Sequence, residues 1–106
     1  MPRLEQILGM LKAAPQDTFL QYALAMEYRS LGEAKSAAES FQQLIGKQPP
    51  HVPSFFMYGQ LLVETGDIEQ ARSVLREGIE QARVQGDAHA AGEMSQFLAD
   101  LGQLGE

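Results

Sequence analysis

Two stretches of the chain carry the same pattern, and they decide the fold. Residues 24–33 read LAMEYRSLGE, and residues 58–67, which begin 34 positions later, read YGQLLVETGD. In both stretches a large apolar residue precedes a small one, a second large residue comes three positions on, and a glycine and an acid close the run. Recurrence at a fixed period of this length indicates a repeat architecture whose unit is one supersecondary element.

The match extends beyond these stretches in both directions. Moving 34 positions forward pairs Ala37 with Ala71, Phe41 with Leu75, and Ile45 with Ile79; moving 34 back from Phe41, Ile45 and Pro49 reaches Ile7, Leu11 and Pro15. The apolar residues recur with helical spacing. Gly32 and Gly66 suit the left-handed turn that follows a helix, and Asp67 with Gln70 resembles a capping box. Each unit is therefore predicted to be two helices.

The predicted elements cover almost the whole chain. Helices are expected at about 2–13, 18–30, 33–46, 52–64, 68–85 and 87–101, and the tail 102–106 is expected to fray. They divide a single domain, 1–106, into an N-terminal capping helix (1–15), two repeats (18–51 and 52–85) and a C-terminal capping helix (87–102). The last helix departs from the 34-residue register, because Leu24 and Ala25 moved by two periods reach Gly92 and Glu93.

These residues resemble the tetratricopeptide repeat. The resemblance lies in Leu24-Ala25-Tyr28, Gly32-Glu33, Ala37, Phe41, Leu44 and Pro49, and in Tyr58-Gly59-Leu62, Gly66-Asp67, Ala71, Leu75 and Gly78, with Arg83 where the second proline belongs. It implies an all-α fold in which antiparallel helix pairs stack into a short right-handed α-solenoid of about six helices. Family members mostly hold peptides or partner proteins on the concave face.

Composition narrows the function classes. The net charge is -6, which disfavours nucleic acid and an anionic membrane surface. No apolar stretch is long enough for a secretory signal or a membrane span, so cytoplasmic residence is the default. The chain has no cysteine and only two histidines, His51 and His89. His89 and Glu93 could share a helix face, but two ligands are too few for a closed zinc site. We therefore expect no enzyme activity and no cofactor.

The first helices of the two repeats are more apolar than packing within a helix pair requires. Phe19, Tyr22 and Met26 are spaced as one helical stripe. Moving Tyr22 by 34 positions reaches Phe56, so stacking is expected to merge the two helices' surplus residues into one patch. The resemblance places this patch on the concave face. The predicted partner-binding residues are Phe19, Tyr22, Met26, Arg29, Phe56, Met57, Gln60 and Val63.

Two interpretations of the patch stay open. One is a groove that binds a peptide or partner protein, since adaptable methionines and exposed rings suit such a surface. The alternative is that the patch is buried, either within the molecule or against a second copy in a self-associating module, a homodimer. The family's grip on a C-terminal carboxylate through Lys and Asn is not expected, because Tyr22, Met26, Met57 and Gln60 occupy the matching positions.

Overall fold

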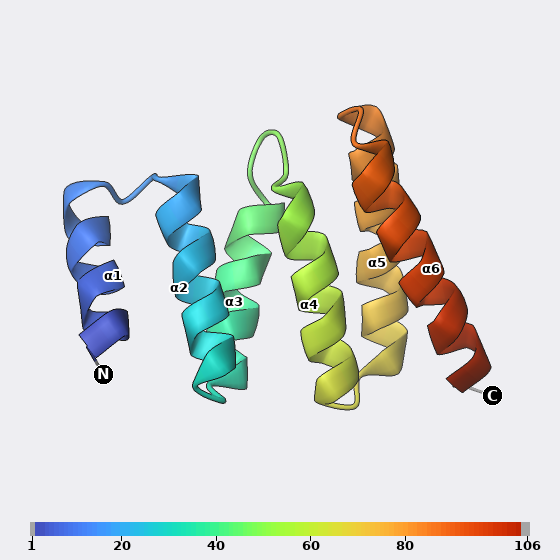
Figure 1. Ribbon diagram of the computed structural model, residues 1–106, viewed down its shortest axis with the longest axis horizontal. Coiled ribbons are helices and arrows are strands. Elements are labelled where there is room, and N and C mark those ends of the chain that lie inside the picture. The colour runs from blue at the N-terminus through green and yellow to red at the C-terminus, as the bar shows by residue number, and fades with distance from the viewer. Residues whose placement is uncertain (1, 105–106) are drawn as a thin grey trace. The chain divides into compact units, whose positions relative to one another are not determined.

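The fold was analysed in a computed structural model that describes residues 2–104, with side chains described for residues 3–102. All regular structure in residues 2–104 is helical (Figure 1). The helices are α1 (Pro2–Ala13), α2 (Thr18–Ser30), α3 (Ala34–Ile45), α4 (Val52–Glu64), α5 (Ile68–Val84) and α6 (Ala88–Leu104). The predicted all-α helical repeat fold is confirmed.

The chain divides into two compact units between His51 and Val52. The first unit holds α1, α2 and α3, and α2 contacts both of its neighbours. The second unit holds α4, α5 and α6, and α5 contacts both of its neighbours. Successive helices within each unit run antiparallel (Figure 1). The prediction of a single domain concerns how the two units sit together, and it stays a prediction.

Three helices, α2, α4 and α5, each end in the same type of turn. Gly32, Gly66 and Gly86 have φ values of 77°, 87° and 80°, which a residue with a Cβ atom rarely adopts. Around Gly66, the Gly66 amide donates to the Val63 carbonyl at 3.1 Å, and the Asp67 amide donates to the Leu62 carbonyl at 2.8 Å. This pair of hydrogen bonds is a Schellman motif, which satisfies the last carbonyls of the helix. The left-handed turns predicted at Gly32 and Gly66 are confirmed.

Aspartates open three of the helices. The Asp17, Asp67 and Asp87 carboxylates accept hydrogen bonds from the amides of Leu20, Gln70 and Ala90 at 3.1, 3.4 and 3.0 Å. Each carboxylate satisfies an amide that has no partner inside the helix. The cap predicted at Asp67 is present, and Asp17 and Asp87 cap their helices in the same way. The third helix is one residue shorter at each end than predicted, because Glu33 and Gly46 are its flanking caps.

Small residues lie where the helices of a pair approach each other. Ala25 and Ala37 in the first unit, and Ala71 in the second, are fully buried. A Cβ atom added to Gly59 would lie 2.8 Å from the Leu75 side chain, so α4 and α5 approach more closely there than alanine allows. Phe41 and Leu75, the repeated large residues, are also fully buried. The 34-residue pattern is therefore the packing pattern of each helix pair.

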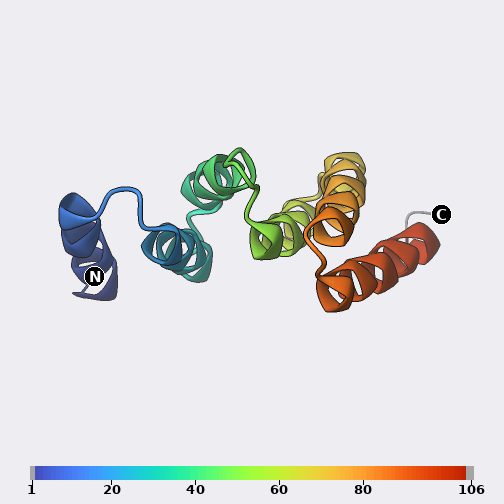
Figure 2. The same ribbon diagram turned by 90° about the horizontal axis from the view of Figure 1, so that it is seen from above.

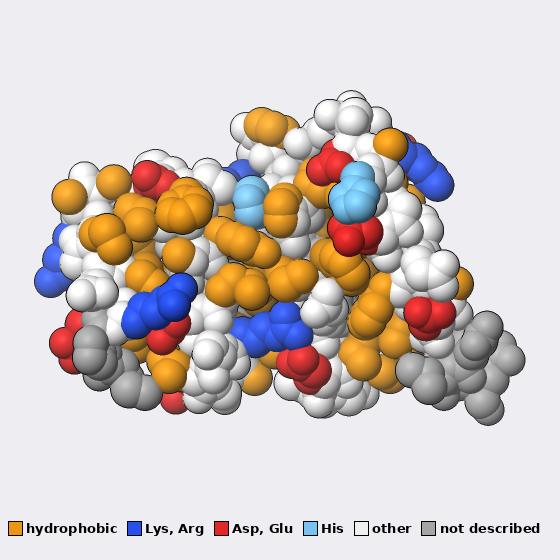
Figure 3. Space-filling view, in the orientation of Figure 1, with side chains coloured by type: hydrophobic (Ala, Val, Ile, Leu, Met, Phe, Trp, Pro, Cys, Tyr) orange, Lys and Arg blue, Asp and Glu red, His pale blue; other side chains and the backbone are white. Residues whose placement is uncertain are grey.

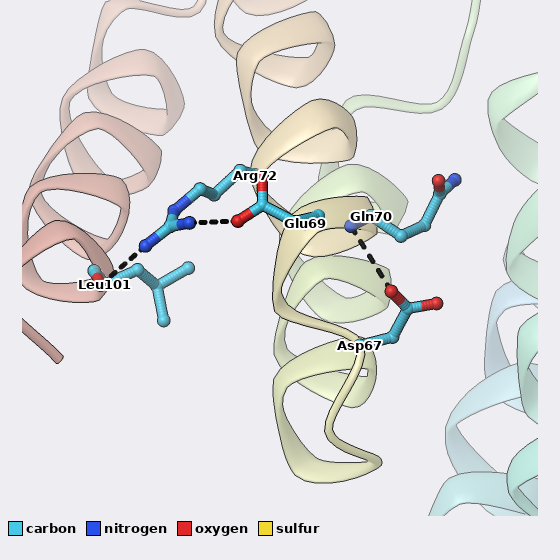
Figure 4. A network of polar contacts seen from close by, with 5 residues as sticks. All are labelled: Asp67, Glu69, Gln70, Arg72 and Leu101. Carbon is cyan, nitrogen blue, oxygen red and sulfur yellow. Dashed lines mark hydrogen bonds and ion pairs between the residues drawn. The ribbon is translucent and has the colours of Figure 1, made fainter. Parts of the chain in front are cut away.

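The expected fraying from Gly102 is wrong for the part of the tail that the structure describes. Helix α6 continues to Leu104, while Gly105 and Glu106 lie outside the described residues. Leu101 is 2% exposed, and its carbonyl accepts a hydrogen bond from Arg72 Nη2 on α5 at 3.3 Å (Figure 4). Arg72 also pairs with Glu69. The end of α6 is thus held by the burial of Leu101 and by a side-chain cap from α5.

Candidate functional site

In the first unit, the predicted stripe lies on α2. Phe19 is 77% exposed, whereas Tyr22, Met26 and Arg29 are half-buried. Figure 3 shows apolar side chains reaching the surface over α2 on the face turned to the viewer. An aromatic ring this exposed contributes little to the helix pair. Phe19 is therefore available for contact with another molecule.

Tyr22 is held by two other rings of the same unit. Its ring centroid lies 6.4 Å from that of the buried Phe41 and 5.0 Å from that of His51. Burial raises the pKa of the Tyr22 phenol, although the positive charge of Arg29 acts in the opposite direction. The hydroxyl thus stays protonated at neutral pH. The sequence predicts that Tyr22 lies outside the residues that pack the helix pair, but its contact with Phe41 makes it part of that packing as well.

His51 borders the same stripe, at the end of the loop after α3. Burial lowers the pKa of the His51 imidazole, and the nearby Lys47 ammonium lowers it further. Lys47 Nζ donates to Thr18 Oγ1 at 2.9 Å and lies 3.4 Å from the Gln16 carbonyl. These bonds tie the α3–α4 loop to the start of α2. The loop therefore presents a neutral imidazole beside Tyr22 and a cation near the helix start.

In the second unit, the predicted residues lie on α4, where Phe56, Met57, Gln60 and Val63 are all half-buried. Phe56 meets Phe97 of α6 edge to face, with ring centroids 5.5 Å apart and planes at 66°. This geometry is a favourable one for aromatic pairs. Figure 2 shows α4 and α6 on the same side of α5, which is what allows side chains of the two helices to meet.

A shallow hollow opens beside this ring pair. It is lined by Phe56, Glu93, Gln96, Phe97 and Asp100. Gln96 Nε2 donates to Asp100 Oδ1 at 3.0 Å across one turn of α6. The lining thus combines two aromatic rings with two carboxylates. We call this feature the α4–α6 hollow.

The residues that α6 contributes were not among the predicted site residues. Phe97 lies on the predicted C-terminal capping helix, where it is half-buried and forms a wall of the hollow. Glu93, Gln96, Phe97 and Asp100 are spaced i, i+3, i+4 and i+7, so they share one helix face. That spacing is readable in the sequence and could have shown them as a group. Their contact with Phe56 could not be predicted from the sequence, because α6 departs from the repeat register.

The structure brings the predicted residues together within each unit, on α2 or on α4. The prediction that Tyr22 and Phe56 belong to one patch depends on how the two units are placed, and it stays a prediction. Within the part of the chain that the structure describes, no three histidine, aspartate or glutamate side chains could hold a metal ion. His89 Nε2 lies 3.5 Å from Glu93 Oε1 on the surface of α6. No helix within residues 2–104 is long and apolar enough to cross a bilayer.

Comparison with known proteins supports the repeat interpretation. The tetratricopeptide repeat family model matches residues 28–96, which is more than half of the chain. The chain belongs to the tetratricopeptide repeat family. Membership of this family indicates a protein–protein interaction module, and tetratricopeptide proteins are typically non-catalytic.

Two similar proteins match over almost the whole chain, beyond the segment that the family model covers. A TPR repeat-containing protein of Pseudomonas aeruginosa is 29% identical over 98 residues, which cover 92% of this chain and 93% of that protein. The solution structure of a protein from Bordetella parapertussis matches with a TM-score of 0.82 and 22% identity, and the match covers 94% of this chain and 87% of that one. The second likeness concerns the fold alone.

Proposed function

We propose that this chain binds a peptide segment of another protein through the apolar faces of α2 and α4, without catalysing a reaction. The observation that carries the proposal is the exposure of Phe19. It is 77% exposed and shares its stripe with the half-buried Tyr22 and Met26. Leaving such a ring in water forgoes the free energy of its burial, so a contiguous apolar surface of this kind marks a contact site.

The anchors on each of the two helix faces are already positioned before a partner arrives. Tyr22 is packed against Phe41 and His51, and Phe56 is packed against Phe97. Rings held in one orientation lose little conformational entropy when they contact a ligand. Tyrosine in particular is frequent among the residues that dominate binding energy. Pre-positioned rings therefore favour tight contact with a short segment.

The test uses peptides selected from a random library on the full chain, with affinity measured by fluorescence polarisation. Because Phe19 is exposed, Phe19→Ser should leave the helical content and melting temperature unchanged. Removing an anchor costs about 2 kcal/mol or more, so the selected peptides should bind about 30-fold more weakly. Val84→Ser is the matched control, since Val84 is 69% exposed and lies on α5, a helix that contributes to neither face.

The double variant Tyr22→Ser/Phe56→Ser examines the half-buried anchors, with helicity measured in parallel because Tyr22 also contacts Phe41. The mass of the wild type in dilute solution tests the alternative, which is self-association. If the wild type is a dimer and Phe19→Ser converts it to a monomer, the exposed face serves self-association and not peptide binding. Equal peptide affinity for the wild type and for Phe19→Ser would contradict the proposed binding face.

A further inference from the structure

The net negative charge of this protein comes from one of its two units. Residues 1–51 hold five acidic and five basic side chains, whereas residues 52–106 hold nine acidic and three basic ones. The second unit therefore carries the whole net charge of -6. A cation that approaches this unit is attracted, and an anion is repelled.

The α4–α6 hollow concentrates this charge beside apolar walls. Its lining contains the rings of Phe56 and Phe97, the carboxylates of Glu93 and Asp100, and no lysine or arginine. The three basic residues of the unit, Arg72, Arg76 and Arg83, all lie on α5. Arg72 is occupied by Glu69 and by the Leu101 carbonyl. The hollow thus has negative charge without an internal counter-ion among its lining residues.

Both carboxylates retain acceptor capacity. The Gln96 amide donates to Asp100 Oδ1, and a carboxylate has about four lone-pair sites, so further donors can be accommodated. Glu93 is 3.5 Å from His89, a contact that is an ion pair only when the imidazole is protonated. A ligand that bears several N–H donors would therefore find acceptors at the rim of the hollow.

We propose that the α4–α6 hollow receives an arginine side chain of the peptide partner, a refinement that rests on the proposed function. The guanidinium stacks on aromatic rings and donates in a fork that matches a carboxylate. Its aliphatic stem covers apolar surface while its charged end reaches the rim. Attraction between the cation and the ring faces adds to both effects. An anionic or purely apolar side chain would leave the carboxylates desolvated beside it.

The experiment titrates a blocked tripeptide, acetyl-Gly-Arg-Gly-amide, into the isotope-labelled full chain and follows the backbone amide resonances. The comparison ligand contains citrulline, which has nearly the shape of arginine but no charge. We expect the arginine peptide to shift the resonances of Glu93, Gln96, Phe97 and Asp100, and the citrulline peptide to shift them much less. Equal shifts with both peptides, or shifts confined to other helices, would overturn the proposal.

Two pairs of substitutions separate local recognition from general attraction. Glu93→Gln/Asp100→Asn removes both carboxylates while keeping their shapes, and should weaken arginine-peptide binding about three- to tenfold. Glu77→Gln/Glu80→Gln changes the net charge equally at exposed positions of α5, outside the hollow, and should leave the affinity almost unchanged. Equal losses in the two variants would mean that overall charge attracts the peptide, which contradicts a site in the hollow.

The proposed function can fail separately from this refinement. If library-selected peptides lose affinity with Phe19→Ser but not with Glu93→Gln/Asp100→Asn, the apolar faces bind peptide and the arginine proposal is wrong. If Phe19→Ser has no effect on those peptides, the proposed function itself is wrong. Phe97→Leu, which keeps both carboxylates, should weaken the arginine peptide as well, because one aromatic wall is lost.

Discussion

The sulfur of Met94 occupies space that any side chain on Gly78 would need. A Cβ atom added to Gly78 would lie 2.7 Å from Met94 Sδ and 2.5 Å from Phe55 Cβ. Met94 and Phe55 are both fully buried. Gly78 of α5 is therefore the point at which α4 and α6 pack against the same segment of α5 in the second unit.

Gly78→Ala should destabilise the protein, although alanine is the better helix former by about 1 kcal/mol. The added methyl group must displace Met94 or Phe55, and overpacking of this kind costs about 1–3 kcal/mol. Chemical denaturation measures the loss. Gly92→Ala is the control, because a Cβ atom there meets nothing within 4 Å and the substitution should stabilise α6. If both alanines stabilise the chain, the packing at Gly78 is looser than described.

Met94 should be the main support that α6 gives to α5. Met94→Ala removes a fully buried side chain beside Gly78 and should lower the free energy of unfolding by about 2–5 kcal/mol. Met10→Ala is the matched control, since Met10 of α1 is 50% exposed and its loss should change stability by less than about 0.5 kcal/mol. Similar denaturation midpoints for the two variants would show that α6 contributes little to the core of the second unit.

Deleting the chain after Gln85 extends the same reasoning to the whole helix. Helix α6 buries Ala91, Met94 and Leu101, and its removal takes away the apolar cover of α5. The truncated chain should bind a hydrophobic dye and aggregate, because a terminal unit of a repeat array needs a covered face. A monomeric, helical fragment that leaves the dye unbound would show that α6 is not a cap.

His51 should make the first unit less stable as the pH falls. Burial lowers its pKa in the folded chain, so below about pH 6.5 the unfolded chain binds more protons than the folded one. The free energy of unfolding therefore decreases as the pH drops from about 7.5 to 5.5, and it is recovered as the pH rises again. His51→Gln should flatten this dependence, measured by denaturation at each pH.

Substituting the other histidine provides the comparison for this pH dependence. His89 has a side chain that is 87% exposed on α6, so His89→Gln removes an imidazole from the surface without removing the Tyr22 contact. We expect the His89→Gln variant to keep the loss of stability at low pH, because His51 is still present. Parallel curves for the wild type and His51→Gln would mean that the His51 environment does not favour the neutral imidazole.

Most of the fold is readable from the sequence, because it depends on local chemistry. The helix ends follow from residues that act within one turn, such as the glycine at the left-handed position 66 and the aspartate that caps α5 at position 67. The pairing of helices follows from the 34-residue recurrence, since Ala37 and Phe41 must meet the same kind of neighbour as Ala71 and Leu75. Gly86 makes the same turn, but it lies outside the 34-residue register of Gly32 and Gly66, so the recurrence does not predict it.

The candidate site depends on the fold in three dimensions. Phe19 and Phe56 could be found as apolar residues in excess of what a helix pair needs. The partners of Phe56 could not be found from the sequence, because α6 leaves the 34-residue register. The packing angle of α6 decides which of its side chains reach α4. Phe97, with Glu93 and Asp100 on the same face, meets Phe56 because α4 and α6 both pack on α5 around Gly78. Local periodicity specifies helices, whereas the contact of two helices through a third is a property of close packing.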